Sequence, residues 1–163
     1  MLQAPASDRE GAMLEDGYES SIAHARQLRD AGKELEMMPR SAFWAPITAK
    51  RFLDLKDVGG ADDFFSSDLT DEQLAEKLSH VGELSSTLDV LLVAFSGADE
   101  YVPKAIDTKL LTDRLCKAMN TGAEDGKEVA KPLYIDTGNH NLSEGKGDAD
   151  TLVEEISKIL STM

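Results

Sequence analysis

The sequence predicts an α/β fold in which helices cover both faces of a small parallel sheet. Residues 90–95 (VLLVAF) are apolar at every position, which is typical of a parallel strand buried on both faces. A segment with one apolar helical face follows at 105–119, and a second short apolar run follows at 132–135. Strand, helix and strand in this order predict a right-handed βαβ unit, which a last helix at 150–160 covers.

The first half of the chain has a weaker pattern. Residues 2–4 predict a short strand, and a helix rich in Glu, Arg and Ala is expected from 9 to 30. Residues 33–68 are interrupted by proline and glycine, so only a short helix near 48–55 is expected there. The sequence TDEQ, which starts at Thr70, is a capping box for a helix over 71–79. This half is therefore expected to be an irregular insertion between two strands of one sheet.

The three strands are expected to lie parallel in one sheet, at about 2–4, 90–96 and 132–136. The strand at 90–96 is predicted to be central, because it alone is apolar throughout. With 163 residues, the chain has the length of a single ordinary domain. Asp148 or Asp150 is expected to cap the N-terminus of the last helix.

Composition excludes several classes of partner. The chain has 31 acidic and 17 basic residues, a net charge of −14 at pH 7. Nucleic acids and anionic membranes are bound through basic surfaces, so we expect neither as a partner. The single cysteine excludes an internal disulfide and a cysteine-based zinc cluster. Short apolar runs and early charged residues indicate neither a membrane span nor a signal peptide, and we expect a cytoplasmic protein.

Polar loops follow both clear strands, where the functional groups of parallel sheets are usually found. Asp99 follows the first strand and His140 follows the second, so the two side chains are expected to meet at one edge of the sheet. A carboxylate that accepts a hydrogen bond from imidazole Nδ1 is the supporting half of a nucleophile–histidine–acid triad. The order of acid and then histidine, each after a strand, is that of α/β-hydrolases.

Simpler interpretations of these residues remain. Asp99 could only cap the following helix, and His140 could be an exposed turn residue. Asp136 is an alternative acid, although its place just after the strand favours a turn role. Cys116 lies among apolar positions of a helix, which favours a buried structural thiol. No calcium loop, phosphate loop or metal-ligand spacing is present in the sequence, so we expect no cofactor and no metal.

Five segments of the sequence carry a resemblance: FSGADEYVP (95–103), DTGNHNLS (136–143), LQAPASDRE (2–10), PRSAFWAPITAKRFLDL (39–55) and DDFFSSDL (62–69). Together they resemble a mainly fungal and plant family of uncharacterised α/β-hydrolase-fold proteins. The first resembles the acid loop of such proteins, and the second resembles their histidine loop. The resemblance implies that Asp99 is the acid and His140 the base of a Ser–His–Asp triad. It also implies a helical, cap-like insertion at about 10–87, followed by a βαβα unit at 88–163.

The sequence departs from this family in one respect. The resemblance implies a preceding half with a G-x-S-x-G nucleophile motif, and no such motif occurs in these 163 residues. We therefore expect the C-terminal half of an α/β-hydrolase. It would supply acid and histidine to an esterase or acyl-hydrolase acting on a small-molecule ester, and would be inactive by itself. The alternative is a noncatalytic, truncated hydrolase-like protein that acts as a protein-interaction module. An unpaired edge at strand 2–4 is also expected to allow self-association.

Overall fold

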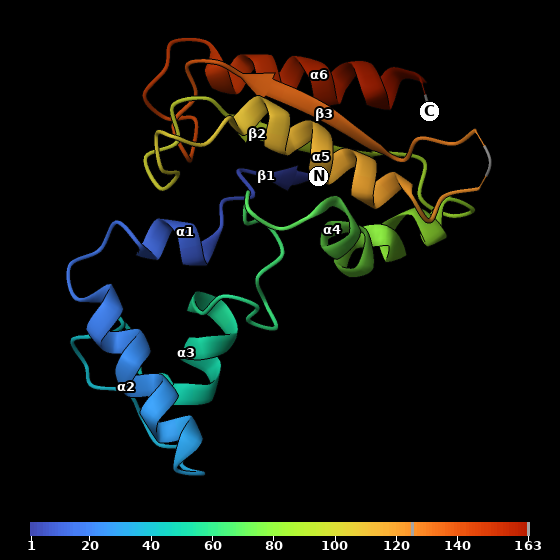
Figure 1. The fold of residues 1–163 in the computed structure, drawn as a ribbon. Coiled ribbons are helices and arrows are strands. Elements are labelled where there is room, and N and C mark those ends of the chain that lie inside the picture. Colours follow the sequence, from blue (N-terminus) through green and yellow to red (C-terminus); the bar gives the residue numbers. More distant parts are fainter. Residues whose placement is uncertain (125, 163) are drawn as a thin grey trace. The chain divides into compact units, whose positions relative to one another are not determined.

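The computed structural model describes residues 1–124 and 126–162, and Figure 1 labels their helices and strands. The chain divides into two compact units. The sheet unit combines Met1–Pro5 with Ser67–Met163, and the insertion unit is Ala6–Ser66. The insertion unit therefore interrupts the sheet unit shortly after its first strand.

A three-stranded parallel sheet organises the sheet unit. Its strands are β1 (Leu2–Gln3), β2 (Leu91–Ser96) and β3 (Ala130–Ile135), in the order β1-β2-β3. Both pairings are parallel, and the β2–β3 register runs from Leu91 opposite Ala130 to Ser96 opposite Ile135. The prediction of three parallel strands with the apolar strand in the centre is confirmed.

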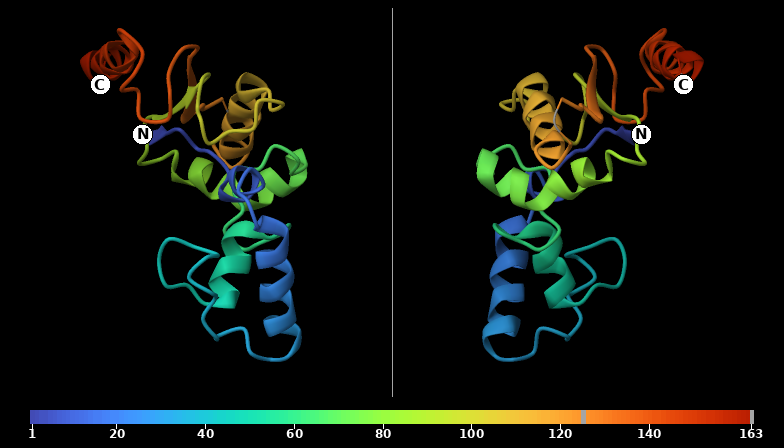
Figure 2. Two further views of the ribbon diagram at one scale, coloured as in Figure 1. Left: turned by 90° about the vertical axis from the view of Figure 1, so that its left-hand side faces the viewer. Right: turned by 90° about the vertical axis from the view of Figure 1, so that its right-hand side faces the viewer.

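Helices cover both faces of this sheet (Figure 2). On one face, α6 (Asp148–Thr162) buries Leu152 against Leu92 and Ala94 of β2. On the other face lies α5 (Thr108–Asn120), which packs against β2 and β3. β2 is apolar on both faces because both are covered, which explains its unbroken run of apolar residues.

Two further elements of the sheet unit pack against α5. These are α4 (Asp71–Leu78) and the 3₁₀ helix η1 (Ser79–Leu84). The predicted capping box is present, since Thr70 Oγ1 accepts from the Gln73 N–H and the Gln73 side chain accepts from the Thr70 N–H. Whereas the sequence suggested an insertion over about 10–87, the structure groups α4 and η1 with the sheet.

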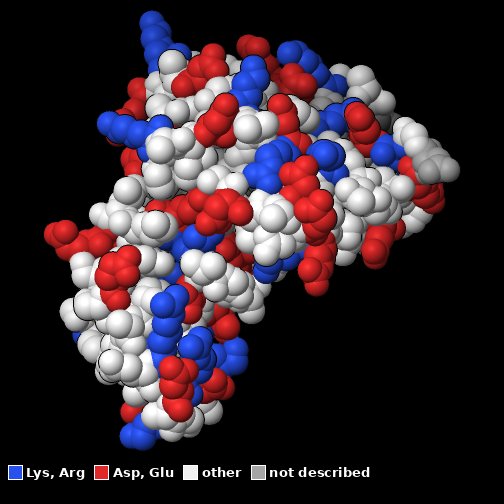
Figure 3. Space-filling model, in the orientation of Figure 1, with Lys and Arg blue, Asp and Glu red and all other residues white. Residues whose placement is uncertain are grey.

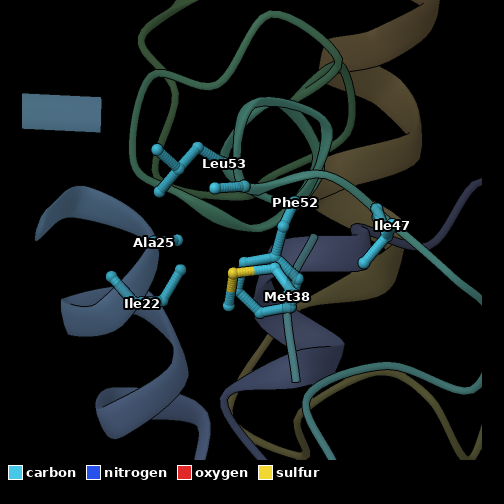
Figure 4. Close-up of a cluster of buried hydrophobic side chains, with 7 residues drawn as sticks. Ile22, Ala25, Met38, Ile47, Phe52 and Leu53 are labelled. Carbon is cyan, nitrogen blue, oxygen red and sulfur yellow. The ribbon is translucent and has the colours of Figure 1, made fainter. Parts of the chain in front are cut away.

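The insertion unit contains α1 (Asp8–Ala12), α2 (Tyr18–Asp30) and α3 (Ala49–Lys56). The prediction of one helix over 9–30 is wrong, because the helix is interrupted between α1 and α2. Gly17 there has a φ of 83°, a left-handed conformation that a right-handed helix cannot contain. Buried apolar side chains form the core of this unit (Figure 4): Ile22, Ala25, Met38, Ile47, Ala49, Phe52 and Leu53.

A buried polar network joins the two ends of the insertion unit. Arg9 Nε donates to Asp63 Oδ2 at 2.9 Å, and these side chains are only 4% and 1% exposed. Ser66 Oγ donates to the other oxygen of Asp63 and lies 2.6 Å from Ser7 Oγ. Ser7 also accepts from the Glu10 N–H as the N-cap of α1. The segments that enter and leave the insertion are thus bonded to each other.

Other expectations concern the ends of the chain and its surface. The helix α6 already begins at Asp148, so neither Asp148 nor Asp150 stands before the helix as the predicted N-cap. None of the helices described is both long and apolar enough to cross a membrane. Acidic and basic side chains are interspersed on the face shown in Figure 3, although acidic residues predominate in the sequence.

We predict that Asp63→Ala destabilises the insertion unit by about 3 kcal/mol, because it removes one partner of a buried ion pair. Native-state hydrogen exchange of the amides in α2 and α3 measures this loss. Glu36→Ala is the control, since the Lys33–Glu36 pair is 58% and 55% exposed and its loss is expected to cost less than about 0.5 kcal/mol. Equal effects of the two substitutions would contradict a structural role for the buried pair.

Candidate active site

The loops after β2 and β3 lie side by side because their strands are parallel neighbours. Hydrogen bonding continues past the strand ends, where the Gly97 N–H donates to Ile135 O at 2.8 Å and the Ala98 N–H donates to Gly138 O at 2.9 Å. A Cβ on Gly97 would lie 2.4 Å from the carbonyl oxygen of Asp136. Only glycine therefore allows the two loops to approach this closely.

Asp99 and His140, which are 41 positions apart, meet where these loops adjoin. Asp99 Oδ2 lies 2.9 Å from His140 Nδ1. The Asp99 side chain is fully buried, whereas the His140 side chain is 40% exposed. The second oxygen of Asp99 accepts from the Tyr101 N–H at 3.0 Å. A carboxylate in this place favours the imidazole tautomer with the proton on Nδ1, which leaves Nε2 free to accept a proton.

The simpler interpretation of Asp99 as a helix cap does not describe the structure. Asp107 is the N-cap of α5, and its Oδ1 accepts from the Leu110 N–H at 2.9 Å. Asp136, the alternative acid, is exposed, and the ring of His140 pairs with Asp99. The structure therefore brings together the two residues that the sequence singled out.

Three neighbours that the sequence analysis did not single out also hold His140. Glu100 Oε2 accepts from the His140 N–H at 3.0 Å, and Gln3 Nε2 donates to the His140 carbonyl at 2.9 Å. The Tyr101 ring meets the imidazole edge to face, with centroids 4.8 Å apart. The rule that parallel strands end at one edge could have identified Gln3, since it ends β1.

These contacts affect the acidity of Glu100. The His140 backbone N–H hydrogen-bonds the Glu100 carboxylate and lowers its pKa, assisted by the N–H of Glu100 itself and by positive charge on His140. The carboxylate is ionised at neutral pH, as that of an ordinary glutamate is. Its hydrogen bond to His140 weakens only as the pH falls through this lowered pKa.

The loop that carries His140 is folded by its own polar side chains. Asn139 is buried, and its Oδ1 accepts from the backbone N–H groups of Ser143 and Glu144 at 2.8 and 3.3 Å. Thr137 Oγ1 donates to Asp148 Oδ1 at 2.7 Å, which fastens the beginning of the loop to the first turn of α6. Hydrogen bonds therefore stabilise the loop both at its beginning and within it.

The remaining candidate residues lie in other elements of the chain. Burial raises the pKa of the Cys116 thiol to about 12, so it is a neutral thiol packed within α5. His24 lies in α2 and His80 in η1. Within residues 1–124 and 126–162, no three His, Cys, Asp or Glu side chains are arranged to hold a metal ion.

Comparison with known proteins gives relatives among fungal esterases. The chain is 35% identical to the UPF0613 protein PB24D3.06c of Schizosaccharomyces pombe, over 70% of this chain and 40% of that protein. It is 32% identical to the fusarinine C esterase sidJ of Aspergillus fumigatus, over 88% of this chain and 48% of that protein. It is 29% identical to the esterase AN6793 of Emericella nidulans, over 98% of this chain and 50% of that protein.

A solved structure has the same fold. The siderophore hydrolase EstB from Aspergillus fumigatus matches 98% of this chain with a TM-score of 0.73 and 28% sequence identity, and the match covers 56% of that chain. The present chain thus spans about half the length of the relatives that it matches. The expected fold class, part of an α/β-hydrolase fold with parallel strands flanked by helices, is confirmed.

A family model matches residues 1–161, almost the entire chain. Its family is described as "Protein of unknown function (DUF1749)". The predicted resemblance to an uncharacterised α/β-hydrolase family is confirmed by this match together with the fungal esterases. The chain belongs to this family.

Proposed function

We propose that this chain supplies the acid and the base of a Ser–His–Asp triad in an esterase-type α/β-hydrolase. His140 is the proposed general base and Asp99 the acid that orients it. The nucleophilic serine would come from outside this sequence, which contains no G-x-S-x-G motif. The Asp99–His140 hydrogen bond at the carboxyl edge of the sheet is the observation that carries the proposal.

The geometry suits each role in acyl transfer. His140 Nε2 would take the proton of the serine hydroxyl while the serine oxygen attacks the ester carbonyl. His140 would then give that proton to the leaving alcohol. Water would then attack the carbonyl of the acyl-enzyme and give a proton to His140 Nε2. That proton would pass to the serine oxygen as the carboxylic acid product leaves. Asp99 would stabilise the imidazolium formed in each step, and its complete burial strengthens this interaction.

Names of the relatives support the substrate class. Two of them are called esterases and a third is called a siderophore hydrolase, so we propose a small-molecule carboxylic ester as the substrate. We also propose that the insertion unit, Ala6–Ser66, has the cap-like role that the sequence predicts for about 10–87.

A fluorophosphonate probe tests whether this chain contains an activated serine. We expect no stoichiometric labelling of the 163-residue chain, because the supporting pair cannot form an acyl-enzyme without the nucleophile. Mass spectrometry of the intact chain measures the label, with a complete serine esterase as the positive control. Stoichiometric labelling of a serine in this chain would contradict the division of the triad.

Substitutions in a completed protein test the roles of the pair. When the chain is joined in frame to a segment that carries the serine motif, we expect ester hydrolysis. His140→Ala should abolish turnover, since the proton acceptor is lost. Asp99→Asn should lower kcat by about 10⁴, the effect of the corresponding change in a serine protease, because the imidazole can adopt the wrong tautomer.

Asp136→Asn is the matched control, because it makes the same chemical change in the neighbouring loop at an exposed position. Turnover of this variant should stay near that of the parent. A large loss with Asp136→Asn and none with Asp99→Asn would reverse the choice of acid. Full turnover in His140→Ala, with Asp99→Asn and Asp136→Asn both silent, would refute the proposed triad.

A further inference from the structure

We infer that Glu100 and Gln3 are positioning residues that clamp the backbone of His140 from both sides and so hold its ring against Asp99. The inference rests on the proposed role of His140. Glu100 accepts from the backbone N–H of His140 at 3.0 Å, and Gln3 donates to its carbonyl oxygen at 2.9 Å. The backbone N–H and the backbone carbonyl of His140 are therefore both hydrogen-bonded by side chains from other segments.

A histidine in this position needs such support. His140 lies in the loop between β3 and α6, and its side chain is 40% exposed. The hydrogen bond between Nδ1 and Asp99 fixes one atom of the ring. Movement of the backbone would therefore change both the length and the angle of this hydrogen bond. Holding the backbone N–H and carbonyl removes this movement and keeps Nε2 in one place, as a general base requires.

The clamp is continuous with the acid. Asp99, Glu100 and Tyr101 are consecutive, and each contacts His140, through the ring nitrogen, the backbone N–H and the imidazole ring respectively. The Tyr101 N–H also bonds to Asp99. Gln3 adds the carboxyl end of β1, so all three strands of the sheet contribute to the position of one imidazole.

The two parts of the clamp differ in strength. Glu100 is ionised at neutral pH, as an ordinary glutamate is, and the hydrogen bond from the His140 N–H lowers its pKa further. A charged acceptor makes a stronger hydrogen bond than a neutral one. Gln3 is a neutral donor to a neutral acceptor. Loss of the Glu100 carboxylate should therefore disturb His140 more than loss of the Gln3 amide.

Nuclear magnetic resonance of the full 163-residue chain tests this inference without requiring any catalysis. Long-range ¹H–¹⁵N spectra measure the two imidazole tautomers at a pH of about 8.5, where an ordinary imidazole is neutral. In the parent chain, His140 should be mainly in the tautomer with the proton on Nδ1. Glu100→Ala should lower the ratio of this tautomer to the other by about threefold or more, as expected for a weakened hydrogen bond.

Matched variants separate positioning from a general loss of charge. Glu100→Gln retains a carbonyl acceptor and should restore most of the tautomer ratio, and Gln3→Ala should lower it less than Glu100→Ala does. Glu144→Ala removes an equal charge from an exposed position in the histidine loop and should leave the ratio unchanged. Equal ratios in the parent, Glu100→Ala and Glu144→Ala would overturn the inference.

The backbone amide of His140 gives a second readout that survives if Glu100→Ala fails to fold. Its proton resonance in the parent should titrate in acid with the ionisation of Glu100, at a midpoint below the usual pKa of glutamate. In Glu100→Gln this titration should vanish, and its persistence would overturn the inference. Neither measurement involves serine or ester, so a correct clamp with no ester hydrolysis in the completed protein would refute only the proposed function.

Discussion

Parallel pairing of β2 with β3 is the constraint on which the candidate site depends. Because both strands run in the same direction, their carboxyl ends reach the same edge of the sheet, and the loops that follow must begin next to each other. The register places Ser96 opposite Ile135, and two further backbone hydrogen bonds extend the pairing to Gly97 and Ala98. A buried acid and a half-exposed histidine then meet without any long-range adjustment of the backbone.

Burial of Asp99 is the electrostatic counterpart of this geometry. Removing a carboxylate from water is costly unless donors replace the lost hydration. Asp99 receives two such donors, the imidazole of His140 and the N–H of Tyr101, and both come from the loops that the strand pairing brings together. Asp99 has these hydrogen bonds only when both loops are folded, and the folded loops bury Asp99. This mutual dependence favours one conformation of His140 over other conformations of its loop.

Much of this arrangement could be predicted from the sequence because it follows from local patterns. The unbroken apolar run at 90–95 identified the central strand, and the position of Asp99 and His140 just after strands identified the pair. The break near Gly17 was missed, since a helical composition on both sides hides a single left-handed residue. Glu100 was missed because its partner is a backbone N–H, which no residue type in the sequence indicates. Gln3 also bonds to a backbone atom, and only its place at the end of β1 could have indicated it.

The buried network of Ser7, Arg9, Asp63 and Ser66 has a consequence for how the chain folds. β1 and β2 are separated by the entire insertion, and closing so long a loop costs conformational entropy. Once the two ends of the insertion are bonded to each other, the chain that must close is only the remainder between the strands. Shortening a loop about threefold lowers its closure cost by about 1 kcal/mol. If the insertion folds first, the entropy cost of pairing the short edge strand β1 with β2 is that of closing only the remaining, shorter loop.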